Sequence, residues 1–343
     1  MSGLIRRKGN LCMQVTILNT PTFPPNAREE DNATRQNIFH NIVEIVQNLD
    51  LESQEITVTF ASLGTASLVA LLQDENDEKY ALKFPINSTY PFREVPFLRA
   101  WEDAGIYTPR VITYGKILKF PYVLMEYIDA PTYWHVFLQT PHEFDISIYK
   151  SIGDQLAQIH TVETSGYGRL LTDGPEYATH GDWIEKNPYI KNQFAYITEN
   201  NINDQYNFQL PNQDKINNRI FSHIHREETT SYWCHMDCSL GNIFATPHGS
   251  MLFDPGGLLS HPYYDLAHSM VLACIYHDDP IVPAELLFEG YAAMSDVFNN
   301  LQKETLIPFI QFQAVMKIRQ WHAGGKTERL ERLEKILDFS NRF

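Results

Sequence analysis

The chain has 343 residues, 43% of them hydrophobic, which is enough for a large core divided over two domains. Its formal net charge of −15 argues against nucleic acid and anionic membrane surfaces as partners. No run of about 18 apolar residues predicts a membrane span, and four cysteines are too few for a disulfide framework. We therefore expect a reduced, cytoplasmic protein that binds neither nucleic acid nor membrane, and its oligomeric state stays open.

The first fifty residues are expected to form an N-terminal extension with one helix. Residues 1–25 end in the turn-rich segment PTFPPN and are expected to be irregular. In residues 27–49 apolar side chains recur at helical spacing, and acidic residues stand in the first turn, where they favour a helix. The apolar positions are Ile38, Phe39, Ile42, Val43, Val46 and Leu49.

The period-two pattern of strands begins after this extension. Residues 56–72 read ITVTFASLGTASLVALL, and the polar turn QDENDEK separates them from a second strand, YALKF. A helix is expected over residues 92–104, followed by two further strands around a Gly-Lys turn at residues 115–116. These elements predict a small antiparallel sheet in an N-terminal lobe that covers residues 1–128.

Helical patterns predominate from residue 129 onward. Residues 147–163 carry Ile148, Ile152, Leu156 and Ile159 on one face, which predicts a core helix. Residues 164–234 form a polar and aromatic stretch that we interpret as a helical insertion. Further helices are expected at about 263–277, 283–300, 304–322 and 326–339. The fold class is therefore α+β, with a small antiparallel β-sheet lobe and a larger, mainly helical lobe over residues 129–343.

The stretch HMDCSLGN, residues 235–242, brings candidate catalytic side chains into one short loop. Phosphoryl transfer from a nucleotide needs positioning, a divalent metal ion and a carboxylate that receives the acceptor proton, and Asp237 suits the last role. Asn242 in the same loop and Asp254, which follows two short apolar strands, offer the oxygen ligands that Mg²⁺ prefers. The pattern alone is weak, because it arises often by chance.

Two upstream features strengthen this interpretation. Lys83 stands in an apolar strand, where a half-buried ammonium needs a counter-charge, and Glu94 at the start of the next helix could supply it. Gly64, with Thr65 and Ser67 beside it, lies between two apolar strands, where backbone amides could approach phosphate groups. The alternatives at these positions are a lysine that extends to solvent and an ordinary hairpin glycine.

Taken in chain order, these elements resemble the kinase signature set and, more closely, the aminoglycoside phosphotransferase and choline-kinase-like family. The resemblance covers roughly residues 56–300. It rests on REVPFLRAWEDAGIYTPRVITYG, on the hinge-like VLMEYI, on about 70 residues between LAQIH and the catalytic loop, and on FDPGGLLSHPYYDLAHS. The segment SGYGRLLTDGPEYATHGDWI is similar to hygromycin-type members of the family.

This resemblance implies a bilobal protein-kinase-like fold and transfer of the ATP γ-phosphate to a hydroxyl of a small molecule, with Mg²⁺ and with GTP as an alternative nucleotide. Asp237 would be the catalytic base, and Asn242 and Asp254 would hold the metal. Asp265 would brace the catalytic loop, and His235 would support its shape. The implied nucleotide-binding residues are Gly64, Thr65, Ser67, Lys83, Glu94, Met125, Glu126 and Ile128.

The acceptor and two rival functions stay open at this stage. Acidic side chains in the insertion could bind the ammonium groups of an aminoglycoside-like acceptor or could simply be solvated. They are Asp173, Glu176, Asp182 and Glu185. A single glycine in the phosphate loop and Pro255 after the metal aspartate leave a catalytically inactive binding module as one alternative, and a protein kinase is the other. A zinc site at Cys234, His235 and Cys238 is disfavoured because the second pair of ligands is missing.

Overall fold

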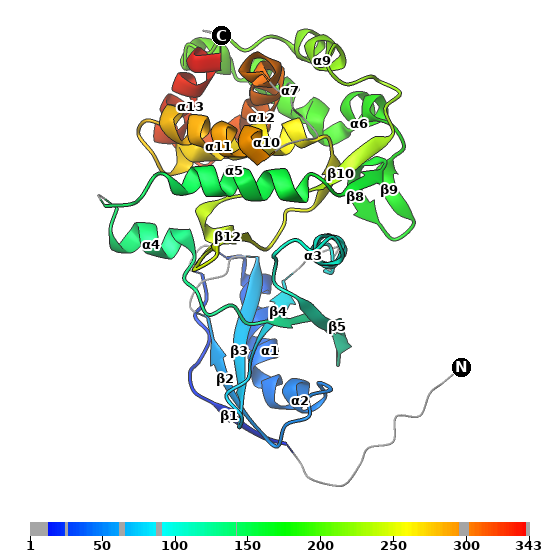
Figure 1. The fold of residues 1–343 in the computed structure, drawn as a ribbon, viewed down its shortest axis with the longest axis vertical. Coiled ribbons are helices and arrows are strands. Elements are labelled where there is room, and N and C mark those ends of the chain that lie inside the picture. The colour runs from blue at the N-terminus through cyan, green and yellow to red at the C-terminus, as the bar shows by residue number, and fades with distance from the viewer. Residues whose placement is uncertain are drawn as a thin grey trace. The chain divides into compact units, whose positions relative to one another are not determined.

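In the computed structural model the chain forms two compact units. It describes residues 13–24, 27–61, 66–86, 91–141, 143–294 and 302–340, with side chains up to 338 (Figure 1). The N-terminal unit comprises Met1–Pro96 and Pro109–Asp129, and the C-terminal unit comprises Phe97–Thr108 and Ala130–Phe343. Nucleotide binding by the N-terminal lobe and catalysis by the C-terminal lobe stay predictions.

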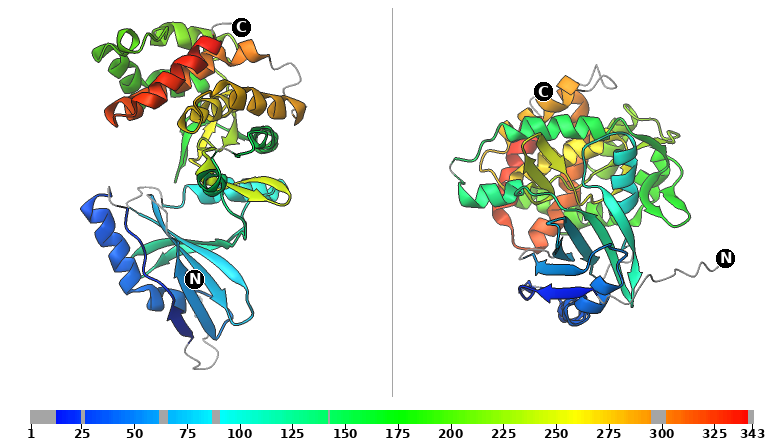
Figure 2. Two further views of the ribbon diagram at one scale, coloured as in Figure 1. Left: turned by 90° about the vertical axis from the view of Figure 1, so that its left-hand side faces the viewer. Right: turned by 60° about the horizontal axis from the view of Figure 1, so that its bottom comes forward.

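A six-stranded sheet forms the centre of the N-terminal unit. Its spatial order is β1-β2-β3-β4-β6-β5, and all described neighbours pair antiparallel except β1 and β2. The strands are β1 (Gln14–Ile17), β2 (Glu55–Phe60), β3 (Ser67–Asp74), β4 (Lys79–Pro85), β5 (Val111–Ile117) and β6 (Phe120–Glu126). Every second residue of β2 is buried, and these side chains pack against the helices α1 (Glu29–His40) and α2 (Ile42–Gln47), which cover one face of the sheet (Figure 2).

The N-terminal extension differs from the prediction in two ways. Residues 14–17 are not irregular, because they pair in parallel with β2 along its outer edge. This strand has no buried position, so it carries no alternation by which a pattern could reveal it. The single predicted helix is two helices with a break at Asn41, and after the break Ile45 is buried while Val43 is 38% exposed.

The second strand pair turns later than predicted. Gly115 lies inside β5, and the chain reverses at Leu118, whose φ of 55° is left-handed. Gly115 stands opposite Tyr122 of β6, and a Cβ atom added to the glycine would lie 3.6 Å from the tyrosine ring. Gly115 is therefore a strand residue that faces a cross-strand aromatic side chain at ordinary contact distance, and it does not form the turn.

The C-terminal unit consists of helices around a second, five-stranded sheet of order β7-β10-β13-β8-β9. The sheet strands are β7 (Glu163–Ser165), β8 (Tyr167–Leu171), β9 (Gly174–Tyr177), β10 (Thr230–Cys234) and β13 (Leu258–Ser260), and a separate hairpin pairs β11 (Ile243–Thr246) with β12 (Gly249–Leu252). Its helices include α4 (Tyr133–Gln139), α5 (Ile148–Ile159), α6 (His180–Lys186), α7 (Pro188–Glu199), α8 (Ile202–Gln205), α9 (Gln213–Phe221), α10 (Pro262–Leu272), α11 (Ile281–Met294), α12 (Lys303–Ala323) and α13 (Thr327–Ser340).

The predicted insertion is only partly helical. Its first third forms the hairpin of β8 and β9, and the prediction missed it because Gly166 and Gly168 interrupt the apolar alternation. Both glycines have positive φ angles, of 79° and 87°, which residues with side chains rarely adopt. The α+β class is nevertheless confirmed, because an antiparallel-rich sheet dominates the N-terminal unit and helices predominate in the C-terminal unit. Among the described residues, no helix combines the length and apolarity that a membrane span requires.

Candidate active site

The predicted catalytic loop is a rigid segment between β10 and the β11–β12 hairpin. The side-chain amide of Asn242 donates from Nδ2 to the backbone oxygen of Asp237 at 3.0 Å and to its Oδ2 at 2.9 Å. The loop ends in a short 3-10 helix, Leu240–Asn242, whose last N–H donates to the Ser239 carbonyl. The amide thus fixes the Asp237 carboxylate and leaves it partly exposed.

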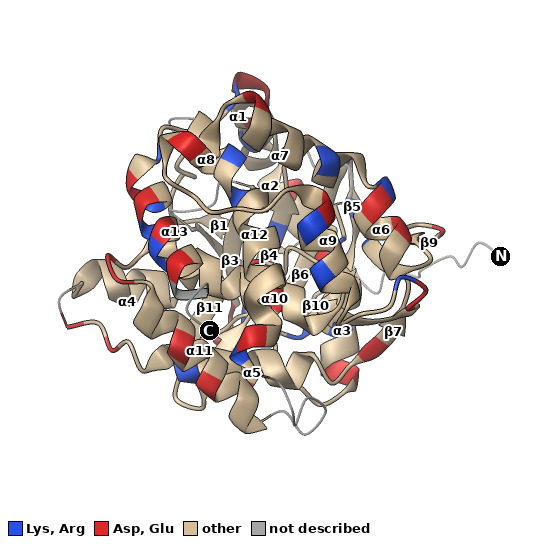
Figure 3. Cartoon of the chain, turned by 90° about the horizontal axis from the view of Figure 1, so that it is seen from above, with Lys and Arg blue, Asp and Glu red and all other residues tan. Residues whose placement is uncertain are grey.

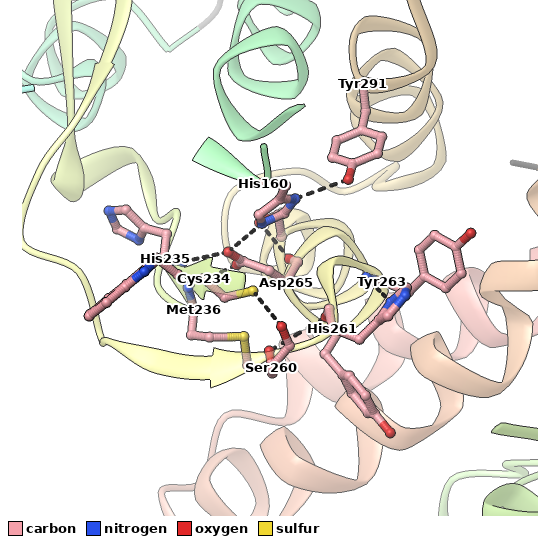
Figure 4. Close-up of polar contacts among 12 residues, drawn as sticks. His160, Cys234, His235, Met236, Ser260, His261, Tyr263, Asp265 and Tyr291 are labelled. Atoms are coloured by element: carbon pink, nitrogen blue, oxygen red, sulfur yellow. Dashed lines mark hydrogen bonds and ion pairs between the residues drawn. The ribbon is translucent and has the colours of Figure 1, made fainter. Parts of the chain in front are cut away.

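Asp265, near the start of α10, braces this loop from below. It is fully buried, and its carboxylate accepts the backbone N–H of His235 at 2.5 Å and that of Met236 at 2.8 Å. The Nε2 of His160 lies 3.0 Å from the same carboxylate, and its Nδ1 lies 3.1 Å from the Tyr291 hydroxyl (Figure 4). Burial by itself would raise the pKa of Asp265, but these hydrogen bonds and nearby histidines hold it below its usual value.

His235 holds the shape of the loop through both ring nitrogens. Its Nε2 lies 2.9 Å from the Phe253 carbonyl, which can only accept, so Nε2 carries the proton. Its Nδ1 therefore accepts the backbone N–H of Asp237 at 3.2 Å. The ring stacks on Trp101 with an interplanar angle of 5°, and burial lowers its pKa. His235 is accordingly a neutral structural group with no ring nitrogen left for a metal ion.

The β11–β12 hairpin brings the second acidic segment to the catalytic loop. The hairpin pairs Ile243 with Leu252. The next residues continue the pairing, because the N–H of Phe253 donates to the Asn242 carbonyl at 3.1 Å. Asn242 is therefore hydrogen-bonded to the residue that directly precedes Asp254. Asp254 adopts a left-handed φ of 52°. Such backbone strain in a non-glycine residue is typical of functional sites.

Asn242 and Asp254 fit the metal role predicted for them. The Nδ2 of Asn242 is turned toward Asp237 by two hydrogen bonds, so the amide oxygen is directed away from it. An amide oxygen and a carboxylate are oxygen donors of the kind that hard divalent cations prefer.

A second cluster, of His160, Cys234 and Asp265, has its ligand atoms within 4.8 Å of one another but is already satisfied internally. Burial raises the pKa of the Cys234 thiol well above its usual value, and the thiol donates to the Ser260 carbonyl. Because the Asp265 oxygens accept three N–H groups, the cluster is better explained as the brace of the loop than as a metal site.

A cavity of about 550 Å³ opens beside Asp237 within the C-terminal unit. Its volume is in the range of small-molecule sites. Asp237, Met236 and Ser239 of the loop form one wall, and α12 and α13 contribute Lys317 and Arg329. Aromatic side chains form a further part of the lining; they are Trp134, Tyr276 and Trp321. A candidate base therefore faces a pocket large enough for a small acceptor.

In the N-terminal unit, the ion pair predicted between Lys83 and Glu94 is present. The Nζ of Lys83 lies 2.6 Å from Oε2 of Glu94, and the two side chains are only 8% and 5% exposed. Lys83 is on β4, and Glu94 is the first residue of α3 (Glu94–Asp103). Contact of Lys83 with phosphate stays a prediction.

The other predicted nucleotide residues occupy the end of β6 and the start of β3. Met125 is half-buried and Glu126 is exposed, and Ile128 follows the strand. The N–H of Glu126 donates to the Arg110 carbonyl, so any base contact of Glu126 would use its carbonyl oxygen. Ser67 is the first residue of β3. Gly64 and Thr65 lie outside the described residues.

Several residues of this site were missed by the sequence analysis. His160 and Tyr291 hold Asp265, and Trp101 donates from its indole N–H to the Trp233 carbonyl while it stacks on His235. His160 lies at the end of the predicted core helix. A polar residue next to the apolar face of that helix was the one sequence feature that could have indicated its role. Lys317 and Arg329 in the cavity gave no local signal, because they lie in helices whose partners the sequence does not reveal.

The fold and this loop define a protein-kinase-like phosphotransferase. The sequence model of the family described as "Phosphotransferase enzyme family" matches residues 57–299, and the chain belongs to this family. The ethanolamine kinase of Plasmodium vivax is 14% identical, with a TM-score of 0.53 over 92% of this chain and 90% of that one. A Thermobifida fusca protein assigned as a fructosamine-3-kinase is also 14% identical, with a TM-score of 0.53 over 83% and 94%.

These structural similarities establish the fold alone. A protein assigned as a fructosamine-3-kinase, from Haemophilus somnus, gives a TM-score of 0.51 at 14% identity over 82% of this chain and 90% of that one. Comparison with curated protein sequences returns no significant match. The predicted membership of the phosphotransferase family is confirmed, and the finer similarity to hygromycin-type members stays a prediction.

Proposed function

We propose that this protein transfers the γ-phosphoryl group of ATP to a hydroxyl of a small molecule, with Asp237 as the catalytic base. The observation that carries the proposal is the Asp237 carboxylate, which Asn242 holds at the wall of a cavity of about 550 Å³. A carboxylate in this position can orient the acceptor hydroxyl and receive its proton. The volume of this cavity is that of a site for a small molecule, which favours a small acceptor over a polypeptide.

In the proposed reaction, the acceptor oxygen forms a bond to the γ-phosphorus while the bond from that phosphorus to the β,γ-bridging oxygen breaks. The bond electrons leave with ADP, and the hydroxyl proton passes to Asp237. We assign Asn242 and Asp254 as the residues that would hold Mg²⁺, which when bound neutralises phosphate charge. Lys83, held by Glu94, is proposed to contact the α- and β-phosphates, and Met125, Glu126 and Ile128 to bind the base.

Asp265 and His235 are positioning residues in this proposal. Asp265 fixes two consecutive backbone N–H groups of the loop, and His235 fixes the N–H of Asp237 itself. These contacts hold the base without touching substrate. Such positioning matters because a displacement of about 1 Å at a reacting group can cost a factor of 100 in rate.

The test is the substitution Asp237→Asn, which keeps the shape of the side chain and removes its basicity. We expect kcat to fall at least 100-fold, as for loss of a general base, while stabilisation of the protein by Mg-ADP is retained. ADP release and ³¹P NMR of the acceptor would measure turnover, and thermal unfolding would measure nucleotide binding. Full activity in this variant would refute the assignment of the base, and absence of any Mg-ATP stabilisation in the native protein would favour an inactive module.

A further inference from the structure

Two cationic side chains line the cavity beside Asp237, and one carboxylate is too few to balance both. Lys317 and Arg329 both line it, and neither side chain forms a hydrogen bond or ion pair with another described residue. Asp237 is the single carboxylate among the described lining residues. Other cations nearby are used differently, since Arg332 of α13 pairs with Asp278 at 2.5 Å. The lining therefore carries a surplus of positive charge.

Helix geometry explains why these cations reach the cavity. Lys317, Gln320 and Trp321 are spaced i, i+3 and i+4 on α12, so they share one face, and all three line the cavity. Arg329 stands in the first turn of α13. Arg319, two residues after Lys317, is directed elsewhere and lies over the ring of Tyr196, 5.5 Å from its centroid. Among these basic residues of α12, only the one on the face with Gln320 and Trp321 lines the cavity, and Arg329 of α13 adds the second positive charge.

The distribution of charge along the chain makes this lining unusual. Residues 129–310 carry 8 basic and 23 acidic residues, whereas residues 311–343 carry 7 basic and 4 acidic ones. Figure 3 shows that α13 carries positions of both signs. The predominantly acidic unit therefore receives positive charge at its cavity from its last two helices.

Of the four acidic side chains predicted as possible ligands of a cationic acceptor, all but Asp173 form ion pairs with neighbouring basic side chains. Glu176 pairs with Arg169 at 2.8 Å and Asp182 with Lys186 at 2.7 Å. Glu185 pairs with Arg226. None of these acids is among the described residues that line the cavity. An ammonium group in the cavity would instead meet two like charges, which is unfavourable at short range.

We propose that the acceptor is a small hydroxylated anion, whose carboxylate or phosphate ester binds Lys317 and Arg329 while its hydroxyl lies at Asp237. This inference rests on the phosphotransferase function proposed above and names the substrate class of the same site. Burial lowers the pKa of Lys317 while the charge of Asp237 opposes this, so an anionic ligand would further stabilise the half-buried ammonium. The aromatic walls suit the carbon skeleton of such an acceptor.

An alternative use of the two cations is to hold the phosphate that is transferred. The two uses differ in the kinetic constant that changes: loss of an acceptor contact raises the KM for the acceptor, whereas loss of a γ-phosphate contact raises the KM for ATP or lowers kcat for every acceptor. The test therefore needs acceptors that differ in charge but share a scaffold.

The full-length protein would be assayed with Mg-ATP and two matched series. One series is glycerol, 3-amino-1,2-propanediol, glycerate and glycerol 3-phosphate. The other is glucose, glucosamine, glucuronate and glucose 6-phosphate. We expect kcat/KM to be at least tenfold higher for the anionic members, and the preferred member decides between carboxylate and phosphate ester. A higher kcat/KM for the amino compounds would overturn the inference while leaving the phosphotransferase function intact.

Variants then tie the preference to the two cations. Lys317→Met and Arg329→Met should each raise the KM for the anionic acceptor about tenfold, leave the KM for ATP unchanged, and reduce the ratio of kcat/KM between the anionic and the neutral acceptor. Arg319→Met, on the other side of α12, is the matched control and should behave like the native protein. A change confined to the KM for ATP would overturn the acceptor assignment.

Binding provides the readout if no compound in either series is turned over. Thermal unfolding of the Asp237→Asn variant with saturating Mg-ADP would be followed against each compound. The inference is supported if the anionic members stabilise the protein and if adding Lys317→Met abolishes that stabilisation. It is overturned if all members stabilise the protein equally or if none does. Failure of Mg-ADP itself to stabilise the native protein would instead refute the phosphotransferase proposal, so the two failures are distinguishable.

Discussion

Replacement of Asp265 by Asn tests whether the brace beneath the catalytic loop is as important as its geometry indicates. Three N–H groups converge on this fully buried carboxylate, from His235, Met236 and His160. An asparagine presents one oxygen and one NH₂ group in the same space, so in either orientation at least one backbone N–H faces another donor. One charge-assisted hydrogen bond, worth about 1.5–3 kcal/mol, is lost, and the remaining bonds become neutral.

We therefore expect Asp265→Asn to lower the free energy of unfolding by about 3 kcal/mol. The loop would lose its fixed position as well, so kcat should fall about 10- to 100-fold while the KM for ATP changes little. Urea unfolding gives the first quantity and steady-state ADP release gives the second.

Asp278→Asn is the matched control, because this carboxylate is 93% exposed and forms a surface ion pair with Arg332. It should cost less than about 1 kcal/mol and leave kcat unchanged. If Asp265→Asn were no more destabilising than Asp278→Asn and kept its kcat, the argument for the brace would be wrong.

Three further predictions follow from buried groups. Lys83→Met should lower the free energy of unfolding by about 3–5 kcal/mol, because it leaves the Glu94 charge in a buried site. The double variant Lys83→Met/Glu94→Met should regain most of that stability in urea unfolding without regaining activity. Burial lowers the pKa of His180 from 6.5 to about 4, so the unfolded chain binds this proton first as the pH falls. His180 should therefore contribute a loss of about 3 kcal/mol to the free energy of unfolding between pH 6.5 and 4, and His180→Gln should make the pH dependence shallower by about that amount. Gly290→Ala would place a methyl group 2.0 Å from a carbonyl oxygen of α5 and should cost about 1–3 kcal/mol by calorimetry, unlike Gly115→Ala, whose nearest contact is 3.6 Å.

The elements that the sequence predicted well are those in which burial imposes a period. In α5, Ile152, Leu156 and Ile159 are buried as their helical spacing indicated. In β2 and β3 every second residue is buried, as strand alternation requires. The elements that were missed lack such a period, either because no side chain is buried, as in β1, or because glycines interrupt the pattern, as in β8.

The same distinction applies to the site. Asp237, Asn242 and Asp254 could be predicted because they lie close together in the sequence at a characteristic spacing. Lys83 and Glu94 could be predicted because one lies in an apolar strand and the other at the start of the following helix. His160 follows the end of α5 and contacts Asp265, and Tyr291 of α11 contacts His160 in turn, so both support the loop from segments far away in sequence and only through tertiary packing. Their side chains look like ordinary helix residues until the helices are placed side by side.

The acceptor pocket shows most clearly what linear charge cannot reveal. Acidic side chains of the insertion suggested an acceptor with ammonium groups, yet three of the four candidates, Glu176, Asp182 and Glu185, form ion pairs with neighbouring basic side chains and none of the four lines the cavity. Lys317 reaches the cavity because its spacing to Gln320 and Trp321 places all three on one face of α12, and only packing decides which face that is. Acceptor charge is therefore better inferred from the few side chains that line the cavity than from the net charge of the unit, and the matched acceptor series measures which of the two governs recognition.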